Sequence, residues 1–299
     1  MSFKVLFSFA VIYIVWGSTF TAIKFGLESF PPFILAAMRF GLAGFAFLIF
    51  SRGKGLKEMK PSEYSREALI GVLLTSANAG VCWSEQYISS GIASLIVGLI
   101  PVIFVLFNWM SFEKKAPHIA AITGLSVGLF GVVLISSDNA NGDSWAVIGG
   151  LILANCLWAV GSLLFRATPS KHDYFTRASV QLISGSSFLV VLSFLIGERA
   201  VDWTNIGANG ILSVTYLALA GTILAYTCYS YLLKNVRTEL TSTYALVNPI
   251  VAIFFGVLWF NEPFTNKIII SSLLILISVA LVIYGQNVYQ FVFTKKKST

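Results

Sequence analysis

Charged residues are scarce in this sequence. Asp, Glu, Lys and Arg account for 11% of its 299 residues, while hydrophobic residues account for 57%. Soluble domains carry about 25% charged residues, so this composition excludes an ordinary soluble fold. The longest polar connection, residues 51–67, is also too short to be a soluble catalytic domain.

Cysteine and histidine, which build most metal sites, are scarce as well. The three cysteines, Cys82, Cys156 and Cys228, fall within apolar segments at unrelated spacings. We interpret them as packing residues and not as a disulfide framework or zinc site. The two histidines, His118 and His172, lie at predicted loop edges without further ligand residues. The sequence also has no phosphate loop, Ser/His/Asp set or nucleic-acid-binding pattern, so we expect no enzyme activity, no cofactor or metal, and no nucleic-acid partner.

Long apolar segments make up most of the chain. A run of about 20 apolar residues crosses a hydrocarbon core of about 30 Å as a helix. The first run has Trp16 and Lys24 where a cleavable signal peptide needs small residues, so we expect it to remain as a span. The sequence predicts an all-α membrane protein in contact with lipid. Its ten expected transmembrane helices are residues 5–25, 32–50, 68–88, 92–112, 118–136, 145–165, 175–196, 209–232, 240–260 and 267–289.

The basic residues that give the net charge of +7 are distributed as in a membrane protein. With the N-terminus in the cytoplasm, most Lys and Arg residues fall in cytoplasmic loops, while the opposite side carries Lys24, Arg199 and Lys267. Short cytoplasmic loops characteristically carry such an excess. We therefore predict that both termini are cytoplasmic and that residues 291–299 form a basic tail.

The two halves of the chain match each other weakly but in the same order. Aligning them places Trp16 on Trp158 and Pro101 on Pro249. Because five helices per copy is an odd number, the second copy must enter the membrane from the opposite side. The loop charges agree with this inversion.

An inverted repeat has a functional meaning. Many secondary transporters consist of inverted repeats with the substrate site near the midplane between them, and channels can share this architecture. We predict two inverted five-helix repeats, residues 1–138 and 139–290, around a central cavity.

The two repeat-related prolines fall near the middle of their predicted helices. Each removes an N–H, so Pro101 and Pro249 leave the carbonyls of Val97 and Ala245 without their helical partners. Two interpretations remain open: a packing kink, or a hinge or broken helix along the substrate path.

Two charged side chains lie within predicted spans. Arg39 lies about 10 Å from the outer end of its helix at 1.5 Å per residue, and Glu85 is the clearest carboxylate within a span. An intramembrane arginine needs a partner or a cavity, so we predict an Arg39–Glu85 ion pair. It is either structural or functional, with Glu85 as a proton or cation site and Arg39 holding Glu85 or a substrate carboxylate.

Polar and aromatic residues are numerous within the spans. Aromatic walls with scattered hydroxyls and amides suit a small amphipathic solute, and an aromatic face can hold a cationic amine. Small residues such as Gly17, Ser18 and Thr19 also suit plain helix packing. The candidate substrate-binding residues are Trp16, Ser18, Thr19, Asn78, Trp83, Ser94, Asn155, Trp158, Gln181, Tyr226, Tyr244 and Asn248. We expect Trp16 to face Trp158 across the repeat axis.

Glycines follow one side of the fifth predicted helix. Gly124, Gly128 and Gly131 allow close helix contact, either within the chain or across a dimer. We favour a monomer.

Four segments carry a family resemblance. "VWGSTFTAIKFG" (15–26), "PPFILAAMRFGLAG" (31–44), "SGIASLIVGLIPVIFVLF" (90–107) and "TSTYALVNPIVAIFFGVLWFNEPFT" (241–265) resemble the EamA branch of the drug/metabolite transporter superfamily. The resemblance implies a ten-helix transporter of the bacterial inner membrane. It also implies a cavity built by helices 1–4 and 6–9, with helices 5 and 10 peripheral.

The resemblance specifies fold better than substrate. We expect a secondary active transporter that exports amino acids or similar small metabolites by alternating access, with proton coupling as one option. A multidrug or lipophilic-cation exporter and a facilitative exchanger are the alternatives. Gln181 replaces Arg39 in the second copy, so any charge-based coupling is asymmetric.

Overall fold

The structure, a computed structural model, describes residues 2–53, 55–107, 109–110, 119–136, 143–236, 241 and 243–294. In this part of the chain all regular secondary structure is helical and no strand is present. The elements are α1 (Phe3–Leu27), α2 (Pro32–Ser51), the 3₁₀ turn η1 (Leu56–Glu58), α3 (Pro61–Ser84), α4 (Ser90–Val97), α5 (Ile100–Phe107), α6 (Ile119–Ser136), α7 (Asp143–Ala167), α8 (Tyr174–Leu195), α9 (Ala208–Ala218), the π-helical turn η3 (Leu219–Leu224), α10 (Ala225–Asn235), α12 (Tyr244–Phe260) and α13 (Asn266–Thr294).

Every predicted apolar run contains one of these helices, and two runs are divided. Residues 92–112 hold α4 and α5, and residues 209–232 hold α9, η3 and α10. Six described segments are long and apolar enough to cross a membrane, and three shorter helices are apolar as well. α3 is in neither group, and its first turns carry Glu63, Arg66 and Glu67. The helices fit a membrane protein, while the count of ten spans and the repeat stay predictions.

Local sequence explains where several helices begin and end. α2 begins at Pro32, whose fixed φ suits the first turn and whose missing N–H has no helical partner to lose. α8 begins after Asp173, whose Oδ1 accepts the N–H of Thr176 at 2.9 Å as an N-cap. α2 stops at Arg52 and Gly53, whose φ angles of 54° and 62° are left-handed and end a helix.

Helices from the two halves of the chain are interleaved. α2 packs along α8, α3 packs along α7 and α8, and α1 packs along α12. Gly17 permits the last of these contacts, because a Cβ atom there would lie 2.5 Å from Cβ of Val251. The close helix approach predicted for Gly17 is therefore present.

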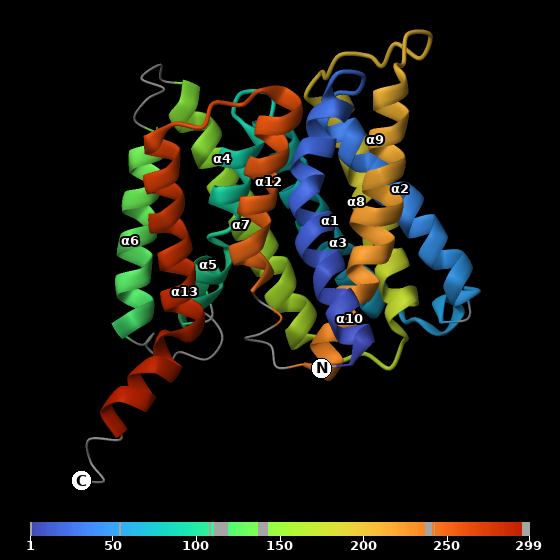
Figure 1. The fold of residues 1–299 in the computed structure, drawn as a ribbon. Coiled ribbons are helices and arrows are strands. Elements are labelled where there is room, and N and C mark those ends of the chain that lie inside the picture. Colours follow the sequence, from blue (N-terminus) through green and yellow to red (C-terminus); the bar gives the residue numbers. More distant parts are fainter. Residues whose placement is uncertain are drawn as a thin grey trace.

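α6 and α13 form a separate pair at one edge of the bundle (Figure 1). The glycine side of α6 makes this contact. Cβ atoms at Gly124 and Gly131 would lie 2.9 Å from O of Ser278 and 3.0 Å from Cγ1 of Ile275. The glycines thus serve packing within the chain, which is the first of the two alternatives that the sequence left open.

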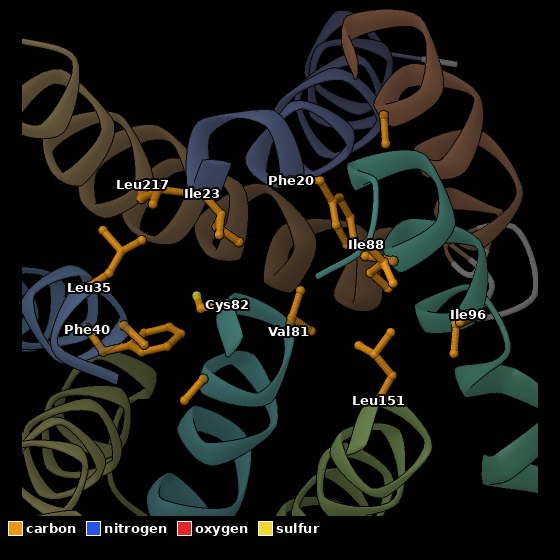
Figure 2. Close-up of a cluster of buried hydrophobic side chains, with 14 of the residues drawn as sticks. Phe20, Ile23, Leu35, Phe40, Val81, Cys82, Ile88, Ile96, Leu151 and Leu217 are labelled. Atoms are coloured by element: carbon orange, nitrogen blue, oxygen red, sulfur yellow. The ribbon is translucent and has the colours of Figure 1, made fainter. Parts of the chain in front are cut away.

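An apolar core fills the space between the remaining helices. Figure 2 shows Phe20, Phe40, Val81, Cys82 and Leu151 turned toward one cluster from α1, α2, α3 and α7. All three cysteines of the chain are free, as expected of packing residues.

The two repeat-related prolines have different effects. The helix breaks at Gly98 and Leu99, just before Pro101 in the first turn of α5, whereas α12 continues through Pro249. A Cβ atom at Gly98 would lie 3.3 Å from O of Ala245, the carbonyl that Pro249 deprives of its helical N–H. The broken-helix interpretation therefore holds at Pro101 but not at Pro249, and a gating role for either stays a proposal.

Candidate functional site

A central cavity of about 110 Å³ lies between helices of both halves. The cavity is lined by residues of α1, α2, α3, α7, α10 and α12 and by Val97 and Ile100, which flank the α4–α5 break. No described residue of α6 or α13 lines it. A single water needs about 10–15 Å³, so the cavity has room for a small solute. Of the predicted site residues, its wall contains Trp16, Thr19, Arg39, Asn78, Asn155, Trp158, Tyr226, Tyr244 and Asn248.

Four predicted binding residues lie outside this wall. Oγ of Ser18 is 2.6 Å from the hydroxyl oxygen of Tyr216 and so joins α1 to α9. Ser94 donates to a carbonyl of its own helix at 2.7 Å. Trp83 lines a second hollow of about 370 Å³ beside the α1–α2 connection, and Gln181 bonds to a buried carboxylate described below.

Arg39 reaches from α2 to the π-helical turn η3. Its Nε donates to Oγ1 of Thr222 at 2.9 Å, and its Nη2 donates to O of Gly221 at 3.3 Å. Both carboxylate oxygens of Glu85, in contrast, lack a hydrogen-bond partner in the described structure. The predicted Arg39–Glu85 pairing is therefore wrong for this conformation, because the guanidinium group is turned toward η3.

Trp16 is fixed to the same turn. Its Nε1 donates to O of Gly221 at 3.1 Å, and its ring centroid lies 5.0 Å from that of Tyr244 and 5.2 Å from that of Tyr229. Trp158 also lines the cavity, but the ring contacts that the structure gives Trp16 are with tyrosines. Trp16 and Trp158 therefore line the same cavity, but no ring contact joins them in the described structure.

The turn η3 is a part of the site that sequence reasoning missed. Oγ1 of Thr222 also donates to O of Leu217 at 2.9 Å, across the π-helical geometry. Single π-helical turns are rare and occur frequently at functional sites. A signal is present in the sequence, since Gly221 and Thr222 interrupt an apolar run. Nothing in the sequence, however, shows that Arg39 would bind there.

Asn155 of α7 holds the broken helix in place. Its Nδ2 donates to O of Ile96 at 2.7 Å, which also accepts the N–H of Leu99 at 3.1 Å. Ile96 lies in the last turn of α4, where carbonyls lose their regular helical partners. Asn155 therefore fixes the α4–α5 break to α7 at the edge of the cavity.

Lys24, in the last turn of α1, and Glu262, just after the end of α12, form an ion pair. Nζ of Lys24 lies 2.7 Å from Oε1 of Glu262. The same carboxylate accepts the N–H of Ser90 at 2.8 Å, its hydroxyl at 3.0 Å and the N–H of Gly91 at 3.3 Å. An anion suits a helix N-terminus, so Glu262 joins α1 to the start of α4. Sequence reasoning did not find this pair, although both residues fall in the family-like segments.

A second ion pair lies at the N-terminal end of α3. Nε of Arg177 donates to Oε1 of Glu67 at 2.6 Å, and Nε2 of Gln181 donates to Oε2 of the same carboxylate at 2.5 Å. The guanidinium carbon of Arg177 lies 4.1 Å from the ring centre of Phe165. This cluster joins α3 to α8, and it explains why Gln181 is absent from the cavity wall.

The two histidines of the sequence form no metal site within the described residues. His118 lies outside the described residues, as do residues 295–299 of the predicted tail. Nε2 of His172 lies 3.5 Å from Oε2 of Glu63. No group of three or more His, Cys, Asp or Glu side chains that could hold a metal occurs in the part of the chain that the structure describes.

Comparisons with known proteins agree over nearly the whole chain. The EamA-like transporter family matches residues 3–137 and 144–284. The "Uncharacterized inner membrane transporter YedA" of Escherichia coli K12 is 31% identical over 283 residues, which cover 93% of this chain and 90% of that protein. The "Probable amino-acid metabolite efflux pump" of the same strain is 25% identical over 290 residues, which cover 92% and 93%.

A solved structure shares the fold. This crystal structure of a protein aligns with a TM-score of 0.64 and 18% identity, and the alignment covers 93% of this chain and 96% of the other. One sequence relative is named as an inner membrane transporter and the other as a probable efflux pump. The chain therefore belongs to the EamA-like transporter family, and it is a transporter rather than an enzyme.

Proposed function

We propose that the protein is a secondary active transporter that exports amino acids or similarly small metabolites by alternating access. The observation that carries this proposal is the position of Arg39 in the wall of a central, largely apolar cavity. The relative named as an amino-acid metabolite efflux pump supports the substrate class at 25% identity.

The chemistry of the wall suits a solute with a carboxylate and an amine. Arg39 donates hydrogen bonds to η3 through Nε and Nη2, and its Nη1 donates none in the described structure. Arginine binds carboxylates through parallel N–H groups. The faces of Trp16 and Tyr244 offer a place for an ammonium group, and the amide of Asn78 offers further hydrogen bonds.

The architecture that we propose is two inverted five-helix repeats, residues 1–138 and 139–290. Support comes from the two separate family matches and from a cavity with walls from both halves. The loop charges support cytoplasmic termini, with residues 291–299 as a basic tail at the bacterial inner membrane. The use of the α6 glycines within the chain supports a monomer.

A multidrug or lipophilic-cation exporter is the second candidate. The aromatic wall favours it, because aromatic faces bind cations. Such an exporter needs a carboxylate in the cavity to neutralise its cargo, and no Asp or Glu occurs among the described wall residues. A facilitative exchanger would use the same cavity and differ only in its driving force.

Counterflow in proteoliposomes tests the proposal. We expect purified protein to accumulate a labelled amino acid when the liposomes are preloaded with the unlabelled form, with alanine, phenylalanine and glutamate as the first probes. Arg39→Gln should lose this uptake, while Arg52→Gln, a control at the exposed end of the same helix, should keep it. Uptake of organic cations but not carboxylates would favour the second candidate, and ohmic flux would indicate a channel.

A further inference from the structure

Glu85 is a buried carboxylate without hydrogen-bond donors. It follows the last residue of α3 and is 4% exposed. Neither of its oxygens has a hydrogen-bond partner among the described residues. A buried ionised carboxylate that lacks donors is strongly unfavourable. The geometry of this conformation therefore suits the neutral acid.

Three titratable groups interact electrostatically with this carboxylate. Lys24 of α1 attracts it, and Glu262, which follows α12, repels it. The thiol of Cys82 lies one turn earlier on α3 and interacts with it as well. In this conformation Lys24 is held at 2.7 Å by Glu262, so this cation is engaged elsewhere.

Glu262 does not depend on Lys24 for its hydrogen bonds. Three donors at the start of α4, two from Ser90 and one from Gly91, bind its two oxygens. The partial positive charge of a helix N-terminus favours the ionised form further. Lys24 can therefore leave Glu262 without stranding a buried charge, whereas Glu85 cannot ionise without Lys24.

We propose that Glu85 binds the coupling proton of the transport cycle and that Lys24 displaces this proton when it moves from Glu262 to Glu85. In this step the O–H bond of the Glu85 carboxylic acid breaks and its proton passes to water. The Lys24 ammonium exchanges one carboxylate partner for the other, and Glu262 stays ionised on α4. One proton is released, and the return of Lys24 takes one up. This inference rests on the proposed transport function.

The site is linked to the cavity through two helices. Val81 lines the cavity and lies one turn before Glu85 on α3, while Ile23 lines it next to Lys24 on α1. Figure 2 shows Ile23 and Val81 in one cluster between these helices. A solute that shifts α1 against α3 therefore changes the distance between Lys24 and Glu85.

Infrared spectroscopy tests proton binding without any substrate. A neutral carboxylic acid and a carboxylate absorb at different infrared frequencies. A pH titration of the full chain in lipid nanodiscs therefore follows the protonation of its carboxyl groups. We expect a neutral-acid band at neutral pH that Glu85→Gln removes. The matched control Glu28→Gln, at an exposed position near the end of α1, should leave the band intact. A band that Glu85→Gln does not change, or the absence of a band in the wild type, would overturn the proposal.

The exchange of Lys24 has its own readout. In Glu262→Gln the amide oxygen still serves Ser90 but attracts Lys24 less, so Lys24 turns to Glu85. We expect the Glu85 band to disappear at a lower pH in Glu262→Gln than in the wild type, and at a higher pH in Lys24→Met. A merely structural Glu85 predicts a band that titrates at the same pH in all three proteins. That result would exclude the exchange.

Transport then separates this proposal from the proposed function. With labelled alanine, phenylalanine and glutamate as probes, Glu85→Gln should lose uptake driven by an imposed pH gradient but keep counterflow, because counterflow moves no net proton. Retained gradient-driven uptake in Glu85→Gln would refute the proton role. If the wild type moves none of the probes, the proposed substrate class fails, while the infrared titrations still decide whether Glu85 and Lys24 exchange a proton.

Discussion

Trp16 and Arg39 donate to the same backbone oxygen, that of Gly221. Nε1 of Trp16 lies 3.1 Å and Nη2 of Arg39 lies 3.3 Å from it. The two side chains come from α1 and α2, and the oxygen belongs to the π-helical turn η3. Both side chains also line the cavity. A movement of η3 therefore changes two walls of the cavity together.

Thr222→Val tests the role of η3. Valine keeps the shape of threonine but removes the hydroxyl that accepts from Arg39 and donates to Leu217. Hydrogen bonds to charged groups contribute about 1.5–3 kcal/mol. We expect a loss of that order in the free energy of unfolding, measured by denaturation in detergent, together with weaker counterflow of carboxylate substrates.

Thr215→Val is the control for this change. Thr215 lies on α9, is exposed, and donates to O of Ile211 in the same helix at 2.8 Å. It should change stability and transport little. Equal effects of the two substitutions would show that η3 has no special role.

Helix positions were predictable because long apolar runs have few alternatives to a membrane helix. The cavity wall was partly predictable from the residues within these runs. Polar and aromatic residues such as Trp16, Asn78 and Asn155 lie deep in those runs, and a bundle turns such residues away from lipid.

The partners of the charged residues were not predictable, because they depend on which helices touch. Depth along the membrane suggested Glu85 for Arg39, but α2 packs beside η3, and Thr222 takes the guanidinium group instead. The pairing of Lys24 with Glu262 likewise requires α1, α4 and α12 to pack against one another. Periodicity and composition do not contain that information.

Gly17→Ala should destabilise the contact between α1 and α12. A Cβ atom there would lie 2.5 Å from Cβ of Val251 and 3.1 Å from O of Asn248, so one helix must move. Overpacking of this kind costs about 1–3 kcal/mol, which a lower melting temperature in detergent would reveal. Gly149→Ala is the matched control, since nothing lies within 4 Å of a Cβ atom there. Equal melting temperatures of the two variants would contradict the tight contact.

Asp173 makes the stability of α8 depend on pH. It lies just outside the predicted span. Partial burial opposes its ionisation, but hydrogen bonds from the hydroxyl and N–H of Thr176 outweigh this and lower its pKa. A carboxyl group with a lowered pKa stabilises the folded state at pH values above its pKa in the unfolded state, about 3.9. This contribution is lost as the pH falls through the pKa of the folded state.

Asp173→Ala should therefore lower the free energy of unfolding by about 1 kcal/mol at neutral pH. This difference from the wild type should disappear as the solution is acidified below a pH of about 4. Melting temperatures across this pH range measure the effect. Asp173→Ser keeps a capping oxygen without a titratable group and should lose less at neutral pH. A difference for Asp173→Ala that is the same at every pH would rule out the contribution of the charge.

Arg177→Met should be among the most damaging single changes in the described structure. It leaves Glu67, which is 2% exposed, with Gln181 as its remaining side-chain partner, and removal of one member of a buried ion pair costs about 3–5 kcal/mol. Arg166→Met, at an exposed position on α7, should cost little. Glu67→Gln in the Arg177→Met background removes the stranded charge and should restore most of the lost stability. Additive losses in that double variant would show instead that Arg177 acts through its packing on Phe165 and not through its charge.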